Sequence, residues 1–150
     1  ALIAFRGQQA ELLLPPTRSL VRAKRNIAAL PGGGGTPLAS AIDAAALLAE
    51  QVQRRGGTPG LVFLTDGRAN IARDGTQGRE RANADALASA PRLRVLRAST
   101  LLIDTSPRPN PAASALATAM GAVYLPMPHA RAHTLRDAVQ AGTGGPARQR

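Results

Sequence analysis

The segment Gly60–Thr65 most constrains the fold, because it reads GLVFLT and its apolar run is uninterrupted. Such a run is typical of a strand buried on both faces of a parallel sheet. Helices have to cover a strand of this kind. The residues before it supply one, since apolar residues recur at helical spacing from Leu38 to Val52. The chain is therefore expected to alternate strands with helices.

The same alternation continues along the chain. Further strands are expected at Ala1–Phe5, Ala10–Leu14, Thr100–Ile103 and Ala122–Leu125, and further helices at Leu20–Leu30, Arg79–Ala90, Ala112–Met120 and Thr134–Ala141. The first two strands are close enough in sequence to form an antiparallel hairpin. Pro15 and Pro16 cannot donate hydrogen bonds to a strand ladder, so the second strand belongs at an edge.

These segments predict an α/β fold with a Rossmann-like, mostly parallel sheet and helices on both faces. We expect one parallel sheet that contains Leu2–Phe5, Leu61–Thr65, Thr100–Ile103 and Ala122–Leu125, with Glu11–Leu14 antiparallel at one edge. Residues 1–141 are expected to form one domain. Residues 142–150 are rich in Gly, Pro and Arg and are expected to be a flexible tail.

Composition excludes several classes of protein. With no cysteine, the chain has no disulfides, no zinc ribbon and no thiol nucleophile, which fits a cytoplasmic protein. No apolar run is long enough for a membrane helix. The net charge of +10 favours anionic partners. Nucleic acid is one candidate, but with only two Phe and one Tyr the chain lacks the stacking residues of single-strand binders, and a solvated basic surface is the plainer interpretation.

The glycine run Gly32–Gly35, followed by Thr36 and Pro37, has two interpretations. It is neither a Walker loop nor a dinucleotide fingerprint, because no strand precedes it and no Lys follows it. In one interpretation Thr36 only caps the next helix. In the other, the glycines let the backbone approach a bound ion, to which Thr36 offers its hydroxyl.

Asp66 directly follows the buried strand, in the order Thr65-Asp66-Gly67. Ligands in parallel α/β sheets bind at this end of the strands. A carboxylate there suits Mg²⁺, which prefers oxygen ligands. The alternative is that Asp66 only opens a turn with Gly67. The pair of Thr36 and Asp66 is more specific than either residue alone, so we take both as candidate metal ligands.

Other candidates are weaker. Asp104 ends a strand, but Arg108 stands where a DxSxS motif needs its second Ser, so Asp104 is interpreted as a turn or cap residue. His129 and His133 are spaced for one helix face, yet no HExxH motif and no Cys accompany them, which disfavours zinc. A Gly-x-Ser-x-Gly elbow is missing, so no catalytic residue is assigned.

The motifs together identify a family. The residues around Thr36 and Asp66 resemble the second and third parts of the metal-ion-dependent adhesion site of von Willebrand factor A domains. Longer segments are similar to the carboxy-terminal domain of magnesium chelatase D subunits: Pro15–Ser19, Leu30–Ala39, Leu64–Ile71 and Ile103–Pro109. The resemblance covers residues 1 to about 140.

One departure limits what the resemblance implies. The family's site begins with DxSxS after the first, central strand, and this sequence contains no DxSxS. We therefore expect a partial domain that lacks the first central strand and the first helix. In the family's usual strand order, the absent strand lies between Ala1–Phe5 and Leu61–Thr65. Only Thr36 and Asp66 are carried over as metal ligands.

The resemblance implies a non-catalytic docking domain in the ATP-dependent enzyme that inserts Mg²⁺ into protoporphyrin IX for (bacterio)chlorophyll synthesis. The implied partners are an AAA+ ATPase I subunit, which uses the ATP, and a porphyrin-binding H subunit. A bound Mg²⁺ would take an acidic side chain of a partner as its last ligand. Two alternatives remain open: the equivalent domain of a cobalt chelatase, and a basic nucleic-acid-binding module.

Overall fold

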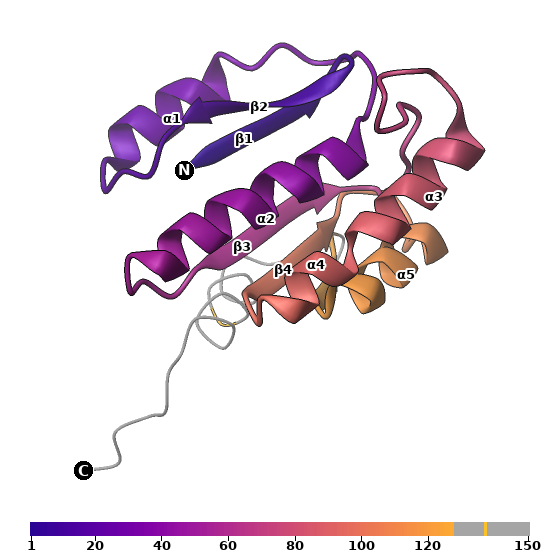
Figure 1. Cartoon of the computed structure of the whole chain (residues 1–150). Helices are drawn as coiled ribbons and strands as arrows, with labels where there is room; N and C mark the ends of the chain where they lie inside the picture. Colours follow the sequence, from indigo (N-terminus) through magenta and orange to yellow (C-terminus); the bar gives the residue numbers. More distant parts are fainter. Residues whose placement is uncertain (128–136, 138–150) are drawn as a thin grey trace. The chain divides into compact units, whose positions relative to one another are not determined.

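The computed structural model describes residues 1–127 and Asp137 (Figure 1). The expected helix Thr134–Ala141, the expected tail 142–150 and both histidines lie outside the described residues. The chain divides into two compact units, one made of Ala1–Ala45 with Ala69–Ser89 and one of Ala46–Arg68 with Ala90–Arg150. Helix α2 (Leu38–Arg54) starts in the first unit and ends in the second.

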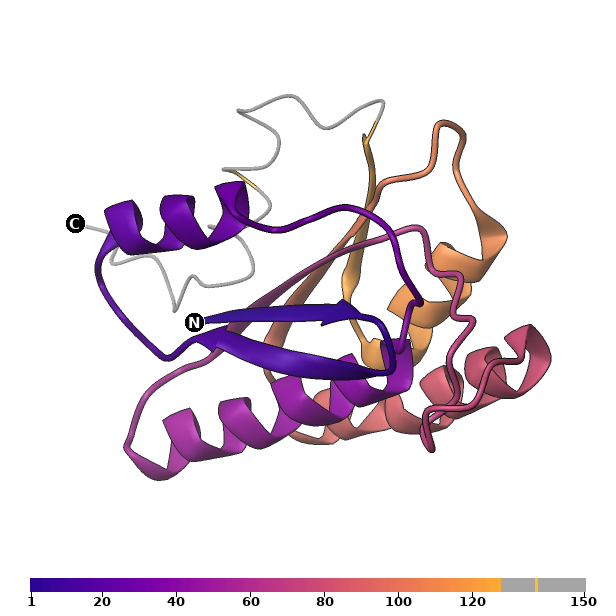
Figure 2. The ribbon, with the colours of Figure 1, turned by 90° about the horizontal axis from the view of Figure 1, so that it is seen from above.

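The first unit is built on an antiparallel hairpin of β1 (Leu2–Arg6) and β2 (Gln9–Leu14), which lie side by side in Figure 2. Gly7 makes the tight turn with a φ of +70°, a conformation that glycine adopts without strain. Helix α1 (Leu20–Ala28) follows, and the Ser19 side chain caps it by accepting a hydrogen bond from the Arg22 N–H. Helix α3 (Arg79–Ser89) completes the unit.

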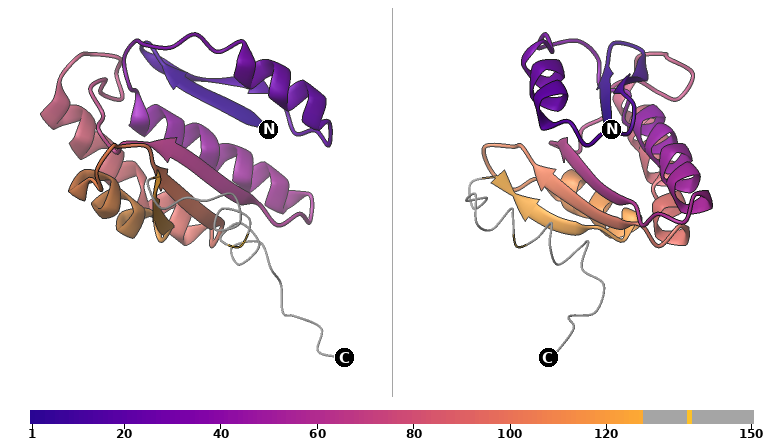
Figure 3. Two further views of the ribbon diagram at one scale, coloured as in Figure 1. Left: turned by 180° about the vertical axis from the view of Figure 1, so that it is seen from behind. Right: turned by 90° about the vertical axis from the view of Figure 1, so that its left-hand side faces the viewer.

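The second unit is built on a parallel sheet with the order β3 (Gly60–Thr65), β4 (Ser99–Asp104), β5 (Val123–Pro126). The sheet, α4 (Pro91–Val95) and α5 (Pro111–Met120) are seen in Figure 3. Helix α5 packs on β4 and β5 and against α4. In the register of the sheet, the last residue of β3 lies opposite the last residue of β4, so the loops that follow both strands start level with each other.

The structure confirms the α/β class, the hairpin and the parallel arrangement of the later strands, but it corrects the expected single sheet. The described strands form two sheets, and β1 pairs only with β2. Each sheet therefore has an outer strand, β1 or β3, whose second edge pairs with no described strand. A continuous sheet needs a hydrogen-bonded neighbour on each side of every inner strand. The strand that the resemblance places between β1 and β3 is not among the described residues.

Two local expectations also change. The helix expected over Arg79–Ala90 ends at Ser89, and Pro91 begins the separate short helix α4, where its missing N–H costs no hydrogen bond. The following strand consequently starts at Ser99. Helix α1 forms as expected, yet its apolar residues Leu20 and Ile27 are exposed by 75% and 55%. Among residues 1–127 and Asp137, the helices include none with the length and apolar character of a membrane span.

Candidate functional site at the strand ends

The carboxyl ends of β3 and β4 bring two loops together. Thr65, the last residue of β3, accepts a hydrogen bond through its backbone oxygen from the Thr105 N–H at 3.2 Å. Asp66 begins the loop after β3, and Thr105–Arg108 forms the loop after β4. Residues that are about forty positions apart in sequence therefore lie next to each other at the carboxyl ends of β3 and β4, as expected for neighbouring parallel strands.

Asp66 is partly buried, and its side chain does two things at once. One carboxylate oxygen, Oδ1, accepts a hydrogen bond from the Arg68 N–H at 3.0 Å. This hydrogen bond forms the turn that was expected from the sequence as the alternative to metal binding. The other oxygen, Oδ2, accepts no hydrogen bond from the described residues. Asp66 therefore shapes the turn and still presents an anionic oxygen to a ligand.

Gly67 fixes the direction in which this loop leaves the sheet. Its φ is +74°, and a Cβ at this position would lie 2.4 Å from the backbone of Ala113 in α5. A glycine is therefore required both by the left-handed backbone and by the close approach of the helix. Asn110 also holds this loop, because its side-chain Nδ2 donates a hydrogen bond to the Asp66 carbonyl at 2.7 Å.

Asp104 is fully buried and holds the neighbouring loop in place. Its Oδ1 accepts the Ser106 N–H at 2.9 Å, and its Oδ2 accepts the Asn110 N–H at 2.8 Å and the Tyr124 hydroxyl at 2.6 Å. Burial by itself raises the pKa of Asp104, but the Ser106 side chain, the Tyr124 hydroxyl and the two backbone N–H groups together keep that pKa below its ordinary value. The interpretation of Asp104 as a turn residue is confirmed.

The same contacts act on Tyr124 in the opposite direction. Burial first, and then the hydrogen bond and the negative charge of Asp104, raise the pKa of the Tyr124 phenol. Asp104 is thus an anion at the carboxyl end of β4, and Tyr124 is a neutral donor to it.

Thr36 lies in the first unit, in a loop that Asn70 fastens. The Thr36 N–H donates to the Asn70 side chain at 2.6 Å, and the Thr36 carbonyl accepts the Asn70 N–H at 3.3 Å. The Thr36 hydroxyl forms no hydrogen bond with the described residues, so it does not cap α2 through its side chain. Gly35 is needed beside it, since a Cβ there would come within 2.5 Å of the Gly7 carbonyl oxygen.

Thr36 and Asp66 belong to different units, so their distance from one another stays a prediction. Among the described residues, no group of three or more His, Cys, Asp or Glu side chains could hold a metal ion. The anionic Oδ2 of Asp66 and the neutral hydroxyl oxygen of Thr36 are the kinds of ligand atom that Mg²⁺ prefers, but two such atoms form only part of its coordination shell.

Sequence reasoning missed two asparagines that position these residues. Asn110 carried a detectable signal, because Asn before Pro is typical of the start of a helix, and its side chain does cap α5 by accepting the Ala112 N–H. Asn70 carried none, since its bond to Thr36 joins loops that only the tertiary fold brings together.

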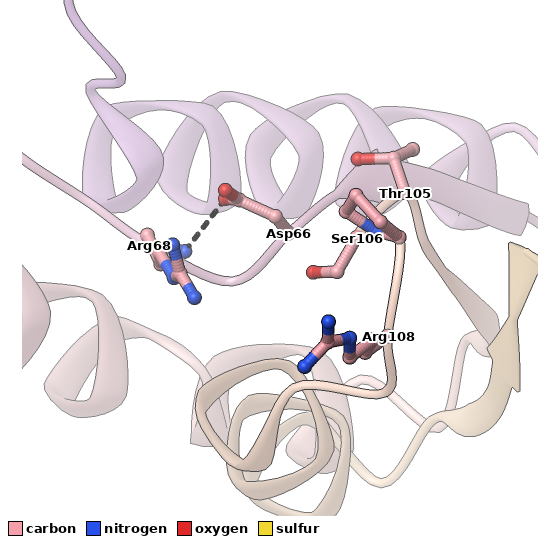
Figure 4. Close-up of a pocket in the computed structure, with 6 residues that line it drawn as sticks. Asp66, Arg68, Thr105, Ser106 and Arg108 are labelled. Atoms are coloured by element: carbon pink, nitrogen blue, oxygen red, sulfur yellow. Dashed lines mark hydrogen bonds between the residues drawn. The ribbon is translucent and has the colours of Figure 1, made fainter.

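The two loops of the second unit enclose a pocket of about 410 Å³ (Figure 4). It is lined by Asp66, Arg68, Thr105, Ser106, Pro107 and Arg108. One carboxylate and two guanidinium groups therefore meet at this pocket, with a net positive charge.

Comparison with known proteins gives several relatives among magnesium-chelatase subunits. Residues 1–68 match the family model of the von Willebrand factor type A domain. The chain is 50% identical over 144 residues to the magnesium-chelatase 60 kDa subunit of Cereibacter sphaeroides, an alignment that covers 96% of the chain and 26% of the relative. It is 48% identical over 141 residues to the 60 kDa subunit of Rhodobacter capsulatus, covering 94% of the chain and 25% of the relative.

A third relative is a 67 kDa magnesium-chelatase subunit. The magnesium-chelatase 67 kDa subunit of Heliobacterium mobile is 39% identical over 150 residues, covering 95% of the chain and 22% of the relative. The chain thus spans about a quarter of the length of these relatives.

Proposed function

Because the chain is a homologue of the magnesium-chelatase 60 and 67 kDa subunits and carries the fold of their von Willebrand factor type A domain, we propose that it is a metal-dependent docking domain. It would serve a D-type subunit of a magnesium chelatase. The similarity to several magnesium-chelatase subunits supports magnesium over the cobalt alternative.

The observation that carries this proposal is the free oxygen of Asp66 at the carboxyl end of β3. The Oδ1 of this residue already serves the turn, and its Oδ2 has no partner among the described residues. The Thr36 hydroxyl likewise forms no hydrogen bond with the part of the chain that the structure describes. Asp66 would contribute a charge to a bound Mg²⁺ and Thr36 a neutral oxygen, while Gly67 and Asn70 hold the two loops in shape.

A bound Mg²⁺ would supply an open coordination position for the carboxylate of a partner. No described residue is assigned a catalytic step. We propose that the partners are the AAA+ ATPase subunit, which uses ATP, and the porphyrin-binding subunit. The domain would transmit the state of the ATPase to the site where Mg²⁺ enters the porphyrin, in a cytoplasmic complex.

The test is the variant Asp66→Asn in the full-length subunit. Asn keeps an oxygen that accepts the Arg68 N–H, so the turn survives while the charge is lost. We expect Mg²⁺-dependent association with the ATPase subunit and Mg-porphyrin formation to fall together, with the ATPase's own hydrolysis little changed. Glu80→Gln is the matched control, because Glu80 is exposed on α3 and loses the same charge.

Thr36→Ala should act in the same direction but more mildly, since it removes a neutral ligand. Thr58→Ala at an exposed position is its control. Normal association and activity of a well-folded Asp66→Asn subunit would refute the docking mechanism. A loss of activity that only follows the loss of soluble protein would assign both residues to turn formation.

A further inference from the structure

The pocket between the two loops holds two arginines that have no partner among the described residues. Figure 4 shows the side chains of Arg68 and Arg108 at the pocket, with Asp66 on its wall. Both arginines are exposed. Neither guanidinium forms an ion pair or a hydrogen bond with any described residue, Asp66 included. Two cations without a counterion at one pocket attract an anion.

Ser106 adds a polar group on the same wall. The residue is 7% exposed, and its hydroxyl oxygen has no hydrogen-bond partner in the described part of the chain. The Ser106 side chain is also one of the groups that lower the pKa of the Asp104 carboxyl. In Figure 4 the side chain is directed between Asp66 and Arg108. A buried hydroxyl without a partner is unfavourable, and an entering oxygen relieves that cost.

The loop that carries Arg108 is held rigidly. Pro107 and Pro109 restrict the backbone on both sides of it. Asp104 fixes the two ends of the loop through the Ser106 and Asn110 N–H groups. The Asn110 side chain then ties this loop to the Asp66 carbonyl. An anion that binds here therefore has little backbone to order, which favours binding.

We infer that this pocket is a carboxylate-binding site, in which Arg68 and Arg108 take the oxygens of an Asp or Glu side chain from a partner protein. The planar guanidinium matches the two oxygens of a carboxylate. The net positive charge of the pocket attracts a phosphate as well, so the choice of a carboxylate rests on docking to an acidic side chain of a partner protein. This inference rests on the proposed docking function for the identity of the partner, and it names the residues that receive the acidic side chain.

The site also explains how a metal and the arginines cooperate. Without a cation, Asp66 repels an incoming carboxylate. A cation held by Asp66 reverses that repulsion, while Arg68 and Arg108 act in the same way in both states. In the absence of a metal, carboxylate binding should therefore strengthen when Asp66 is neutralised by substitution. In the unsubstituted chain, a metal held by Asp66 should strengthen it.

The experiment is site-resolved modification of arginine by phenylglyoxal in the full-length subunit, with peptide mapping by mass spectrometry. Acetate is the probe for a carboxylate, inorganic phosphate is the probe for the alternative anion, and chloride is the reference, all at equal ionic strength. We expect acetate to slow modification of Arg108 and Arg68 several-fold more than phosphate does. Arg55, an exposed arginine directly after α2, should react at an unchanged rate.

In metal-free buffer, Asp66→Asn should increase the protection of Arg108 by acetate. Equal modification of Arg108 with acetate and with chloride would overturn the inference, and stronger protection by phosphate would overturn its assignment to carboxylates.

A second measurement separates this inference from the proposed function. Arg108→Gln should weaken association with the ATPase subunit about tenfold, as expected for a charge-assisted contact, and Arg55→Gln should leave it unchanged. If Asp66→Asn abolishes Mg²⁺-dependent association while Arg108→Gln does not weaken it, the carboxylate pocket is refuted and the metal-dependent docking stands. If Arg108→Gln weakens association and Asp66→Asn does not, the metal is refuted and the pocket stands.

Discussion

Asp104→Asn is the substitution whose effect the structure defines most sharply. The amide has nearly the volume of the carboxylate but only one acceptor oxygen. Asp104 uses one oxygen for the Ser106 N–H and the other for Asn110 and Tyr124. Whichever way the amide lies, a buried backbone N–H faces an NH₂ group.

The magnitude follows from those contacts. A hydrogen bond to a charged group contributes about 1.5–3 kcal/mol, and a buried donor left without an acceptor costs about 1–3 kcal/mol. Removing the charge also relieves part of the penalty for burying it. We therefore expect Asp104→Asn to lower the free energy of unfolding by about 2–4 kcal/mol, a large share of the roughly 5–15 kcal/mol of a typical domain.

The assay is urea unfolding followed by far-ultraviolet circular dichroism. Tyr124→Phe is the control, because it removes only one donor to Asp104 and should cost about 1–2 kcal/mol. The pH dependence gives a second readout. Since the folded pKa of Asp104 lies below its ordinary value of about 3.9, its stabilising contribution is present above that pH and is lost as the pH falls through the folded pKa.

In Asp104→Asn, the loss of unfolding free energy that comes from protonating Asp104 at low pH should be absent. An Asp104→Asn chain that is no less stable than the Tyr124→Phe chain would refute the assignment of Asp104 as the central acceptor of this loop.

Three further outcomes are expected. Tyr124 is the only tyrosine, so the phenolate absorbance of the folded chain should titrate in one step above pH 10, and Asp104→Asn should move that step down. Because the pKa of Tyr124 is raised in the folded chain, the neutral phenol stabilises the fold below pH 10. This stabilisation is lost as the pH rises through the folded pKa of Tyr124. Gly67→Ala should cost about 2 kcal/mol or more in urea unfolding, because both its φ and the start of α5 exclude a Cβ. Asn70→Ala should speed hydrogen exchange at the Thr36 amide, whereas an unchanged rate would mean that Asn70 does not fasten the loop.

Local patterns were enough to predict most of the elements. The apolar run before Asp66 predicted β3 but not its exposure, since Val62 and Leu64 are exposed by 47% and 56% instead of buried. The helical spacing after Thr36 predicted α2, whose Leu38 and Ile42 are fully buried. The position of Asp66 at a strand end followed from the same run. These features depend on residues close in sequence, where side-chain periodicity and turn chemistry act directly.

Patterns predicted the hairpin of β1 with β2, but they could not predict whether β1 also pairs within the parallel sheet. The apolar sequence of β1 suits a parallel sheet and a hairpin equally well, and the structure pairs it only with β2. The apolar stripe of α1 predicted a helix correctly but not its exposure, because burial depends on which surface a helix meets.

The candidate site divides in the same way. The sequence by itself determined the chemistry of Asp66 and Thr36, the glycines beside them and the family to which their motifs are similar. Only the tertiary structure placed Arg108 in the same pocket as Asp66 and made Asp104 an internal anion bound by Tyr124. The physical reason is that strand register is set by hydrogen bonds across the sheet. Those bonds bring together loops whose separation along the chain carries no signal of their contact.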